Sequence, residues 1–418
     1  MQIKLLDCTL RDGGYVNNWK FGEQAISDIK ENLELSGADI IELGFIKNEP
    51  ENKDRTVFNN MSDVKKIIGK NVPNRQYAVM AEVINPLPLD MLEPYKDGFP
   101  EIIRVIVWKR MLEEGFEYCK GIVEKGYKLC VQPARTNQYS DEEFINMIKK
   151  FNELNPMAFY VVDSWGTMYK NELLHYMKLA DENLKEGISI GYHGHNNMMQ
   201  TFDAAAAFCD QNTKRDVIID ASVYGIGRGA GNLNTEIFAK YLNEKCGGKY
   251  NIKPLLRVFD EYILDIYKKE KWGYSLPYFI SAKYNANPAF ANYYEKKGVR
   301  CKIIEKCIKS MEPEKRVIFS DKLALDTLYE ARKSSCKFCI AVPTNNRSNV
   351  VKHWIENVAE ELYEYGVDLI FFDSSVDDDT KYIVEKCGLK NVFYEKYDAK
   401  QIYPNDLDEK VSYCLKAA

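Results

Sequence analysis

The chain has 418 residues, which at about 150 residues per domain predicts two to three domains. It carries 57 Lys and Arg against 62 Asp and Glu, and the resulting charge of −5 argues against an electrostatic nucleic-acid binder. Hydrophobic residues make up 45% and charged residues 28%, which excludes a collagenous or disordered chain.

The first two-thirds of the chain alternate short apolar runs with longer amphipathic segments. Helical periodicity is clear at Glu23–Ser36 and at Asp141–Glu153, where Ser140 is a good N-cap. Eight strands alternating with helices predict a TIM (β/α)8 barrel, although an open doubly wound sheet has the same pattern. The predicted strands are Ile3–Cys8, Asp39–Phe45, Gln76–Val83, Glu101–Val107, Tyr127–Gln132, Ala158–Asp163, Ile188–His193 and Val217–Tyr224.

The pattern changes after about residue 251. Leu255–Lys269 is predicted to be a helix, and a helical segment rich in Tyr and Lys follows up to Lys333. The last block has the order strand, helix, strand, which is a βαβ unit. We therefore expect a barrel at 1–270, a helical extension at 271–334 and a partial module at 335–418. The predicted elements of the last block are strand Phe338–Val342, helix Asn349–Tyr365, strand Val367–Phe372 and helix Asp377–Lys386.

Two histidines, His193 and His195, give the sharpest local signal. Residues two apart on a strand point to the same side, so both imidazoles face one point. With Asp12, which follows the first strand, they make a suitable ligand set for a divalent metal. The neighbouring Arg11 would stabilise a developing enolate. An ordinary pair of rim histidines and a salt-bridged rim arginine are the alternatives that these residues leave open.

Active sites of (β/α)8 barrels lie at the carboxyl ends of the strands, and polar residues occur at nearly every predicted end. A glycine-rich run from Gly225 to Asn232 follows the eighth strand, without the spacing of a nucleotide-binding loop. We expect its backbone to approach the metal and substrate closely. The residues that we expect to bind substrate are Glu42, Gln132, Arg135, Asp163 and Ser164.

Three motifs in this order resemble those of the DRE-TIM metallolyases: DCTLRDGG from Asp7, HGH from His193 and GIGRGAGN from Gly225. This HMGL-like family includes 4-hydroxy-2-oxovalerate aldolase, hydroxymethylglutaryl-CoA lyase and isopropylmalate synthase. The resemblance covers about residues 1–270. It implies a TIM barrel in which Asp12, His193 and His195 hold Mn²⁺ or Mg²⁺, with Asn232 nearby or ligating. It also implies that Arg11 stabilises a metal-bound pyruvate enolate.

The glycine-rich run separates branches of this family. The lyase branch carries a catalytic cysteine there, whereas Gly229-Ala230-Gly231 resembles the 4-hydroxy-2-oxo acid aldolases. We therefore expect an aldolase that joins or separates a 2-oxo acid and an aldehyde. A Claisen-type acyl-CoA condensing enzyme of the same superfamily is the first alternative.

Position 15 departs from the aldolase pattern. Those aldolases have a histidine as general base three residues after the metal-binding aspartate, and here this residue is Tyr15. A phenol with a pKa near ~10 is a poor base at neutral pH. We assign Tyr15 to the catalytic residues. The proton would then be transferred by Tyr15 in a different way from the histidine, by water or by another residue.

The last block resembles the start of a family 2 glycosyltransferase of GT-A fold, in IAVPTNNR from Ile340 and FFDSSVDDDT from Phe371. The resemblance implies that Asp373 contacts the uridine of a nucleotide sugar, and the pairing suggests a role in polysaccharide biosynthesis. A glycan-assembly protein is therefore the second alternative function. Residues 335–418 are too few for a whole transferase, so we expect a truncated or vestigial module. Asp406-Leu407-Asp408 falls too early for the family's metal motif and is interpreted as a helix start.

The cytoplasm is the compartment that the sequence favours. No apolar stretch approaches the ~18 residues that span a bilayer, and the charged start is not expected to be a secretory signal. The 11 Cys are scattered and odd in number, which favours reduced thiols. Cys336 and Cys339 are interpreted as small hydrophobic residues rather than as half of a zinc site. Whether the chain forms a homo-oligomer stays open.

Overall fold

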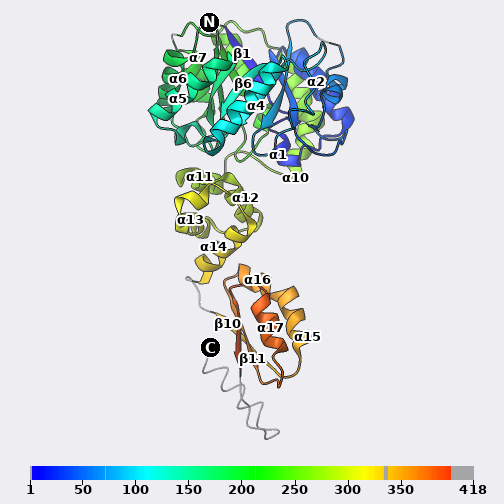
Figure 1. Ribbon diagram of the computed structural model, residues 1–418, viewed down its shortest axis with the longest axis vertical. Helices are drawn as coiled ribbons and strands as arrows, with labels where there is room; N and C mark the ends of the chain where they lie inside the picture. Colours follow the sequence, from blue (N-terminus) through cyan, green and yellow to red (C-terminus); the bar gives the residue numbers. More distant parts are fainter. Residues whose placement is uncertain (1, 71, 212, 334–337, 397–418) are drawn as a thin grey trace. The chain divides into compact units, whose positions relative to one another are not determined.

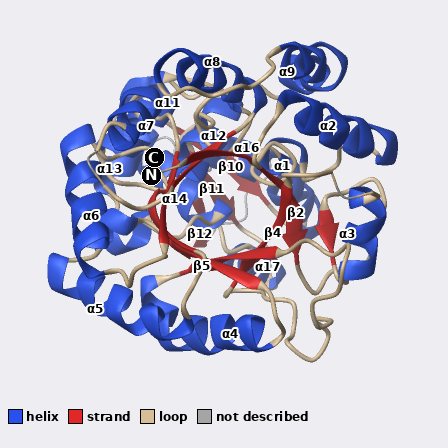
Figure 2. Cartoon of the chain, turned by 90° about the horizontal axis from the view of Figure 1, so that it is seen from above, coloured by secondary structure: helices blue, strands red, loops and turns tan. Residues whose placement is uncertain are grey.

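The computed structural model describes residues 2–70, 72–211, 213–333 and 338–396, and the chain divides into two units, Met1–Ala282 and Lys283–Ala418 (Figure 1). In the first unit eight parallel strands form a ring with helices outside it, which confirms the predicted TIM barrel (Figure 2). The strands of the ring are β1 (Ile3–Asp7), β2 (Ile40–Ile46), β4 (Gln76–Glu82), β5 (Ile102–Val107), β6 (Lys128–Pro133), β7 (Ala158–Asp163), β8 (Ser189–Gly194) and β9 (Val217–Ala221).

The ring is closed by β1, which pairs in parallel with both β9 and β2. Leu6 stands opposite Ile40 on one side and opposite Asp220 on the other. A two-residue strand, β3 (Val57–Phe58), pairs with the carboxyl end of β2 outside the ring. Closure excludes the open doubly wound sheet and brings the ends of β1, β8 and β9 together.

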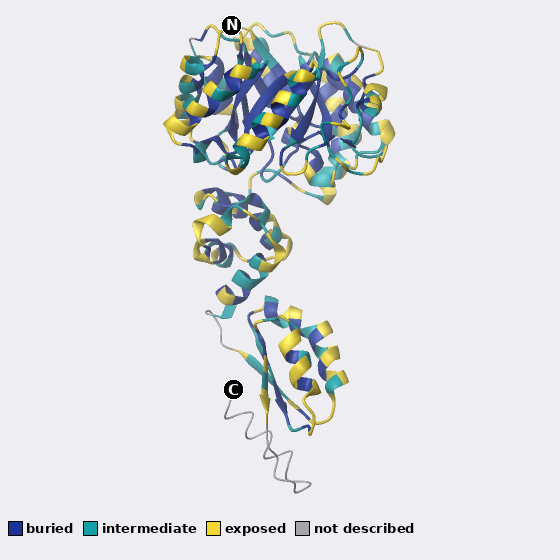
Figure 3. Cartoon of the chain, in the orientation of Figure 1, coloured by how far each residue is buried: buried dark blue, intermediate teal, exposed yellow. Residues whose placement is uncertain are grey.

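Alternation along the strands builds two separate cores. Leu5 belongs to the large apolar core between the barrel and its helices, whereas Leu6 belongs to the small core inside the barrel. The inner core combines branched aliphatic side chains with small residues such as Ala78 and with the ring of Tyr160, and the middle of each strand is buried (Figure 3). The guanidinium of Arg104, fully buried, lies 4.7 Å from the ring centre of Tyr160.

The helices of the first unit follow the predicted alternation. The segment predicted at Asp141–Glu153 is a helix to Phe151 and then a short 3-10 turn, and Ser140 and Glu143 form a capping box at its start. The predicted Leu255–Lys269 helix contains a π-helical turn at Phe259–Ile263. The helices are α1 (Gly14–Asn17), α2 (Glu23–Ser36), α3 (Met61–Ile68), α4 (Leu112–Glu124), α5 (Asp141–Phe151), α6 (Lys170–Asn183), α7 (Thr201–Cys209), α8 (Thr235–Lys245), α9 (Lys253–Val258), α10 (Leu264–Lys269) and α11 (Leu276–Lys283).

The eighth strand is shorter than predicted. It ends at Ala221 rather than at Tyr224, because the backbone N–H of Val223 donates to Oγ1 of Thr9 at 2.8 Å and the chain turns there. Tyr224 then adopts a left-handed conformation with φ 54°. The turn starts the glycine-rich loop at the carboxyl end of the barrel.

The described part of the second unit contains six α-helices and a three-stranded parallel sheet in the order β10-β11-β12, so the predicted βαβ unit is present. Its third strand was not predicted, because only Val392 of that short, polar segment is buried. Tyr363 donates to Oδ1 of Asp326 at 2.5 Å, which joins a helix of the extension to the sheet module. The three-part division stays a prediction. The elements are α12 (Pro288–Lys296), α13 (Cys301–Ser310), α14 (Asp321–Lys333), β10 (Cys339–Thr344), α15 (Ser348–Trp354), α16 (Glu360–Glu364), β11 (Asp368–Asp373), α17 (Asp379–Lys386) and β12 (Val392–Lys396).

Two remaining predictions concern cysteines and membranes. Each cysteine in the described ranges carries a free thiol, whereas Cys336 and the segment Asp406-Leu407-Asp408 lie outside the described residues. Among the described helices, none combines the length and apolar character needed to cross a bilayer.

Candidate metal centre

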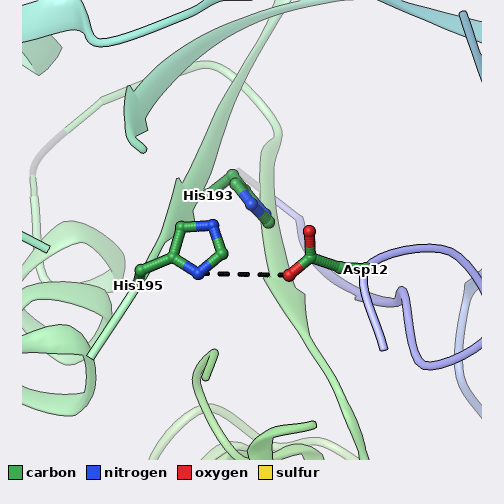
Figure 4. Close-up of side chains that lie close together, drawn as sticks. All are labelled: Asp12, His193 and His195. Carbon is green, nitrogen blue, oxygen red and sulfur yellow. Dashed lines mark ion pairs between the residues drawn. The ribbon is translucent and has the colours of Figure 1, made fainter. Parts of the chain in front are cut away.

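Asp12, His193 and His195 meet at the carboxyl end of the barrel (Figure 4). Each offers one ligand atom, and these atoms lie within 4.8 Å of one another. Nδ1 of His195 is 4.0 Å from Oδ2 of Asp12, and the two imidazole rings are 5.2 Å apart. All three side chains are buried, so the structure brings together the residues that the sequence singled out as metal ligands.

The Asp12 carboxylate is held by the loops after β1 and β9. The backbone N–H of Asp12 donates to the carbonyl of Cys8 at 2.8 Å, and Nδ2 of Asn232 donates to Oδ2 of Asp12 at 2.7 Å. A Cβ at Gly227 would lie 2.5 Å from the same carboxylate oxygen and 2.2 Å from Asn232. Only glycine fits there, and the glycine-rich backbone approaches the site as expected.

A chain of buried ion pairs connects Asp12 to the far side of the barrel interior. Arg11 contacts Oδ1 of Asp12 through Nη1 at 2.5 Å and Oε2 of Glu42 through Nε at 2.7 Å. Arg104 contacts the same Glu42 oxygen at 2.9 Å and pairs with Asp220. Three carboxylates face two guanidiniums, so the network carries one excess negative charge that a cation would balance.

Asp220 extends this network to His193. Its Oδ2 lies 3.0 Å from Nδ1 of His193. Because that nitrogen faces a carboxylate, Nε2 is the nitrogen that remains for a metal, in the arrangement typical of metal-bound histidines.

The ionisation states also suit a cation. Burial alone would raise the pKa of Asp12, but Arg11, the two histidines and the hydrogen bond from Asn232 together outweigh it and hold the pKa below its usual range. Burial lowers the pKa of His195 to about 4, so its imidazole is neutral at pH 7 and has a lone pair to offer. Nδ1 of His195 and Oδ1 of Asn232 are buried without a hydrogen-bond partner in the described part of the chain. Two orphaned acceptors beside an ionised carboxylate fit a divalent cation.

A small cavity of about 60 Å³ opens beside these residues. Gln132 and Ser164, both predicted to bind substrate, lie in its wall, as do Arg11 and Tyr15. With its amide oxygen toward Arg104, Gln132 accepts from Nη2 of that residue at 2.8 Å. The full lining is Arg11, Asp12, Tyr15, Met80, Glu82, Ile106, Trp108, Gln132, Ala134, Val162, Ser164, His193, His195 and Arg228.

Three other predicted substrate contacts lie outside that lining. Glu42 is fully buried between Arg11 and Arg104. The Asp163 carboxylate accepts from the backbone N–H groups of Thr167 and Met168, and burial raises its pKa to about 6. The guanidinium of Arg135 lies 3.6 Å from the ring centre of Trp165. A substrate-binding role for Glu42, Asp163 and Arg135 stays a prediction.

The sequence analysis gave no role to Glu82, which lines the cavity, or to Arg104 and Asp220, which belong to the ion-pair network. Glu82 ends β4 and accepts from Nε1 of Trp108 at 3.1 Å. Arg104 and Asp220 are charged residues inside otherwise apolar strands, and this pattern was the signal that could have revealed them. Burial raises the pKa of the Tyr15 hydroxyl, and the charge of Glu82 raises it further.

The sequence comparisons agree with this geometry. Residues 109–258 match the family model described as HMGL-like. The chain is 24% identical over 294 residues to an oxaloacetate decarboxylase of Mycobacterium tuberculosis, covering 66% of this chain and 80% of that protein. It is also 24% identical over 255 residues to a 4-hydroxy-2-oxovalerate aldolase of Bacillus cereus, covering 60% and 72%. The barrel therefore contains an HMGL-like domain, and its motifs are similar to those of the DRE-TIM metallolyases.

Solved structures show the same fold for this HMGL-like barrel. The N-terminal domain of a candidate aldolase from Bacteroides vulgatus matches with a TM-score of 0.60 at 23% identity, covering 70% of this chain and 96% of that chain. The carboxyl transferase domain of Rhizobium etli pyruvate carboxylase matches with a TM-score of 0.58 at 12% identity, covering 80% and 62%. At these identities the likeness concerns the fold alone.

The second unit has its own buried carboxylate at Asp373. The residue ends β11, and its Oδ1 accepts from the hydroxyl of Ser375 at 2.5 Å, while Oδ2 accepts from Tyr394 at 3.3 Å. Both carboxylate oxygens thus have partners inside the module. The nucleotide-sugar role of Asp373 stays a prediction.

Proposed function

We propose that this chain is a divalent-metal-dependent aldolase that cleaves or forms the C3–C4 bond of a 4-hydroxy-2-oxo acid. The observation that carries the proposal is the convergence of Arg11 with Asp12, His193 and His195 at a cavity of an HMGL-like barrel. The relative named 4-hydroxy-2-oxovalerate aldolase supports the reaction class. The substrates would be pyruvate, or another 2-oxo acid, and an aldehyde.

Asp12, His193 and His195 would hold the cation, with Asn232 as a further ligand through Oδ1. Carboxylate, imidazole and amide oxygen suit Mn²⁺ or Mg²⁺. When bound, such a cation supplies Lewis-acid polarisation of the substrate's keto and carboxylate oxygens.

Arg11 would stabilise the charge that develops during the reaction. Its Nε and Nη1 are occupied by Glu42 and Asp12, whereas Nη2 is buried without a hydrogen-bond partner among the described residues. Because Arg11 lines the cavity, Nη2 is the donor available for the substrate's C2 oxygen. Asp12 and Glu42 hold the guanidinium in place, and Glu42 is itself fixed by Arg104, so little reorganisation accompanies the reaction.

Bond cleavage follows from this arrangement. The C3–C4 bond breaks, its electron pair enters the C2–C3 enolate, and the C4 hydroxyl loses its proton as the aldehyde carbonyl forms. Protonation of C3 then gives pyruvate. The reverse steps form the bond.

Decarboxylation of oxaloacetate is the second candidate, favoured by the relative that carries this name. Loss of CO₂ leaves the same pyruvate enolate, so Arg11 would act in the same way. The two activities differ in one respect, because decarboxylation has no hydroxyl proton to remove.

A paired screen tests the proposal. The protein is incubated with pyruvate and aldehydes of increasing length, and separately with 4-hydroxy-2-oxo acids, with and without Mn²⁺ or Mg²⁺, and products are identified by mass spectrometry. Metal-dependent aldol products support the proposal. Condensation of acetyl-CoA instead would favour the Claisen alternative, and decarboxylation alone would favour the second candidate.

A further inference from the structure

One carboxylate in the cavity wall has no part in the metal centre. Of the two carboxylates in the lining, Asp12 is engaged by Arg11 and Asn232, which leaves Glu82 at the end of β4. Oε1 of Glu82 accepts from Nε1 of Trp108 at 3.1 Å. This hydrogen bond fixes the side chain, and Oε2 accepts no hydrogen bond from the described residues.

Glu82 lies where a base is missing. The resemblance to the 4-hydroxy-2-oxo acid aldolases implies a histidine base at the position of Tyr15, and Tyr15 and Glu82 line the same cavity. Burial and the charge of Glu82 raise the pKa of the Tyr15 hydroxyl, so the phenol stays protonated at neutral pH. The guanidinium of Arg228 lies 5.6 Å from the ring centre of Tyr15.

The wall of the cavity around Glu82 has two parts, because apolar side chains form one part and charged or titratable groups form the other. The other charged or titratable groups in the lining are Arg11, Asp12, Tyr15, His193, His195 and Arg228. The apolar residues of the wall are Met80, Ile106, Trp108, Ala134 and Val162.

We propose that Glu82 is the catalytic base that removes the proton of the substrate's C4 hydroxyl. This inference rests on the aldolase function proposed above. As the C3–C4 bond breaks, its electron pair enters the C2–C3 enolate, the hydroxyl proton moves to Oε2 of Glu82 and the C4–O bond becomes a carbonyl. Water protonates C3 to give pyruvate, and Glu82 returns its proton to the hydroxide that remains. In the synthetic direction Glu82 protonates the new alkoxide.

Two reactions of one enzyme test the role of Glu82. Glu82→Gln is compared with the wild type for cleavage of a 4-hydroxy-2-oxo acid and for decarboxylation of oxaloacetate, both with Mn²⁺ present. Cleavage is expected to fall by about 10²–10⁴-fold, the usual contribution of a general base, while decarboxylation stays near the wild-type rate. Glu82→Asp keeps a carboxylate and is expected to retain part of the cleavage activity. Retained decarboxylation also shows that the variant is folded.

The matched control is Glu113→Gln, on α4, where the side chain is 77% exposed and pairs with Lys150. It is expected to leave both reactions unchanged. Equal loss of both reactions in Glu82→Gln, or loss of neither, would overturn the assignment of Glu82 alone. A wild-type protein that decarboxylates oxaloacetate but cleaves no 4-hydroxy-2-oxo acid would overturn the proposed function, and the role of Glu82 with it.

Discussion

The carboxylate of Asp220 lies 3.0 Å from Nδ1 of His193, with both side chains buried in the barrel. This contact fixes the ring orientation and leaves Nε2 for a metal. Asp220 is itself held by Arg104, which pairs with Glu42. The candidate metal centre therefore rests on an ion-pair network inside the barrel, and each link makes a testable prediction.

Asp220→Asn should weaken metal binding by about 10–100-fold, because a carboxylate that orients a ligating histidine also raises its basicity. Titration calorimetry with Mn²⁺ measures the change. Asp203→Asn, an exposed substitution on α7, is the control and should bind the metal as the wild type does. Equal affinity of Asp220→Asn and the wild type would exclude this positioning role.

Arg104→Met should lower the free energy of unfolding by about 3–5 kcal/mol, because it leaves the buried carboxylates of Glu42 and Asp220 without their shared partner. Urea unfolding of the metal-free protein gives the value. Adding Asp220→Asn removes one stranded charge, so the double variant should lose less stability than the two single variants together. Additive losses would show that the network is not coupled.

Asp12→Asn should abolish metal-dependent pyruvate release from a 4-hydroxy-2-oxo acid, because the amide removes the ligand charge and the ion pair with Arg11. His193→Ala should do the same. Pyruvate release is followed with a coupled lactate dehydrogenase assay, and calorimetry reports Mn²⁺ binding in the same samples. Full release by either variant would disprove the assignment of these ligands.

The barrel and the meeting of Asp12 with His193 and His195 could be predicted because each depends on a local pattern. Strand periodicity gives the number of strands, and the i, i+2 spacing places both imidazoles on one side. Closure then brings β1 next to β9, so a residue near the start of the chain meets the histidines.

The ion-pair network and Glu82 could not be predicted in the same way. Which inward side chains meet across the barrel depends on register and tilt, and these are set only when the ring closes. Arg104 and Asp220 are 116 residues apart in the chain, and each looks like an isolated charge in an apolar strand. Glu82 lies inside the predicted strand Gln76–Val83 rather than after its end, and its place in the cavity wall depends on the closed ring.

Acid should destabilise the metal-free protein partly through His195. Burial lowers the pKa of His195 from 6.5 to about 4, so between these values the unfolded chain binds more protons than the folded one. The contribution of His195 to the free energy of unfolding is at most about 3 kcal/mol. It is fully present above pH 6.5 and is lost as the pH falls through about 4. Urea unfolding in EDTA across this range should show a shallower pH dependence for His195→Asn than for the wild type. Parallel curves would contradict the burial effect.

Position 15 allows the assignment of Glu82 to be tested by restoring activity. The resemblance to the 4-hydroxy-2-oxo acid aldolases implies a histidine base at the position of Tyr15, and burial keeps the phenol of Tyr15 protonated. If Glu82 has taken over proton removal, Tyr15→His should restore part of the cleavage lost in Glu82→Gln, because an imidazole at this position reaches the same cavity. Tyr15→Phe removes the hydroxyl but adds no base, so combining it with Glu82→Gln should restore no cleavage. Pyruvate release by the two double variants, with oxaloacetate decarboxylation as the measure of folded enzyme, distinguishes them. Equal cleavage by both double variants would show that the cavity does not need a base at either position.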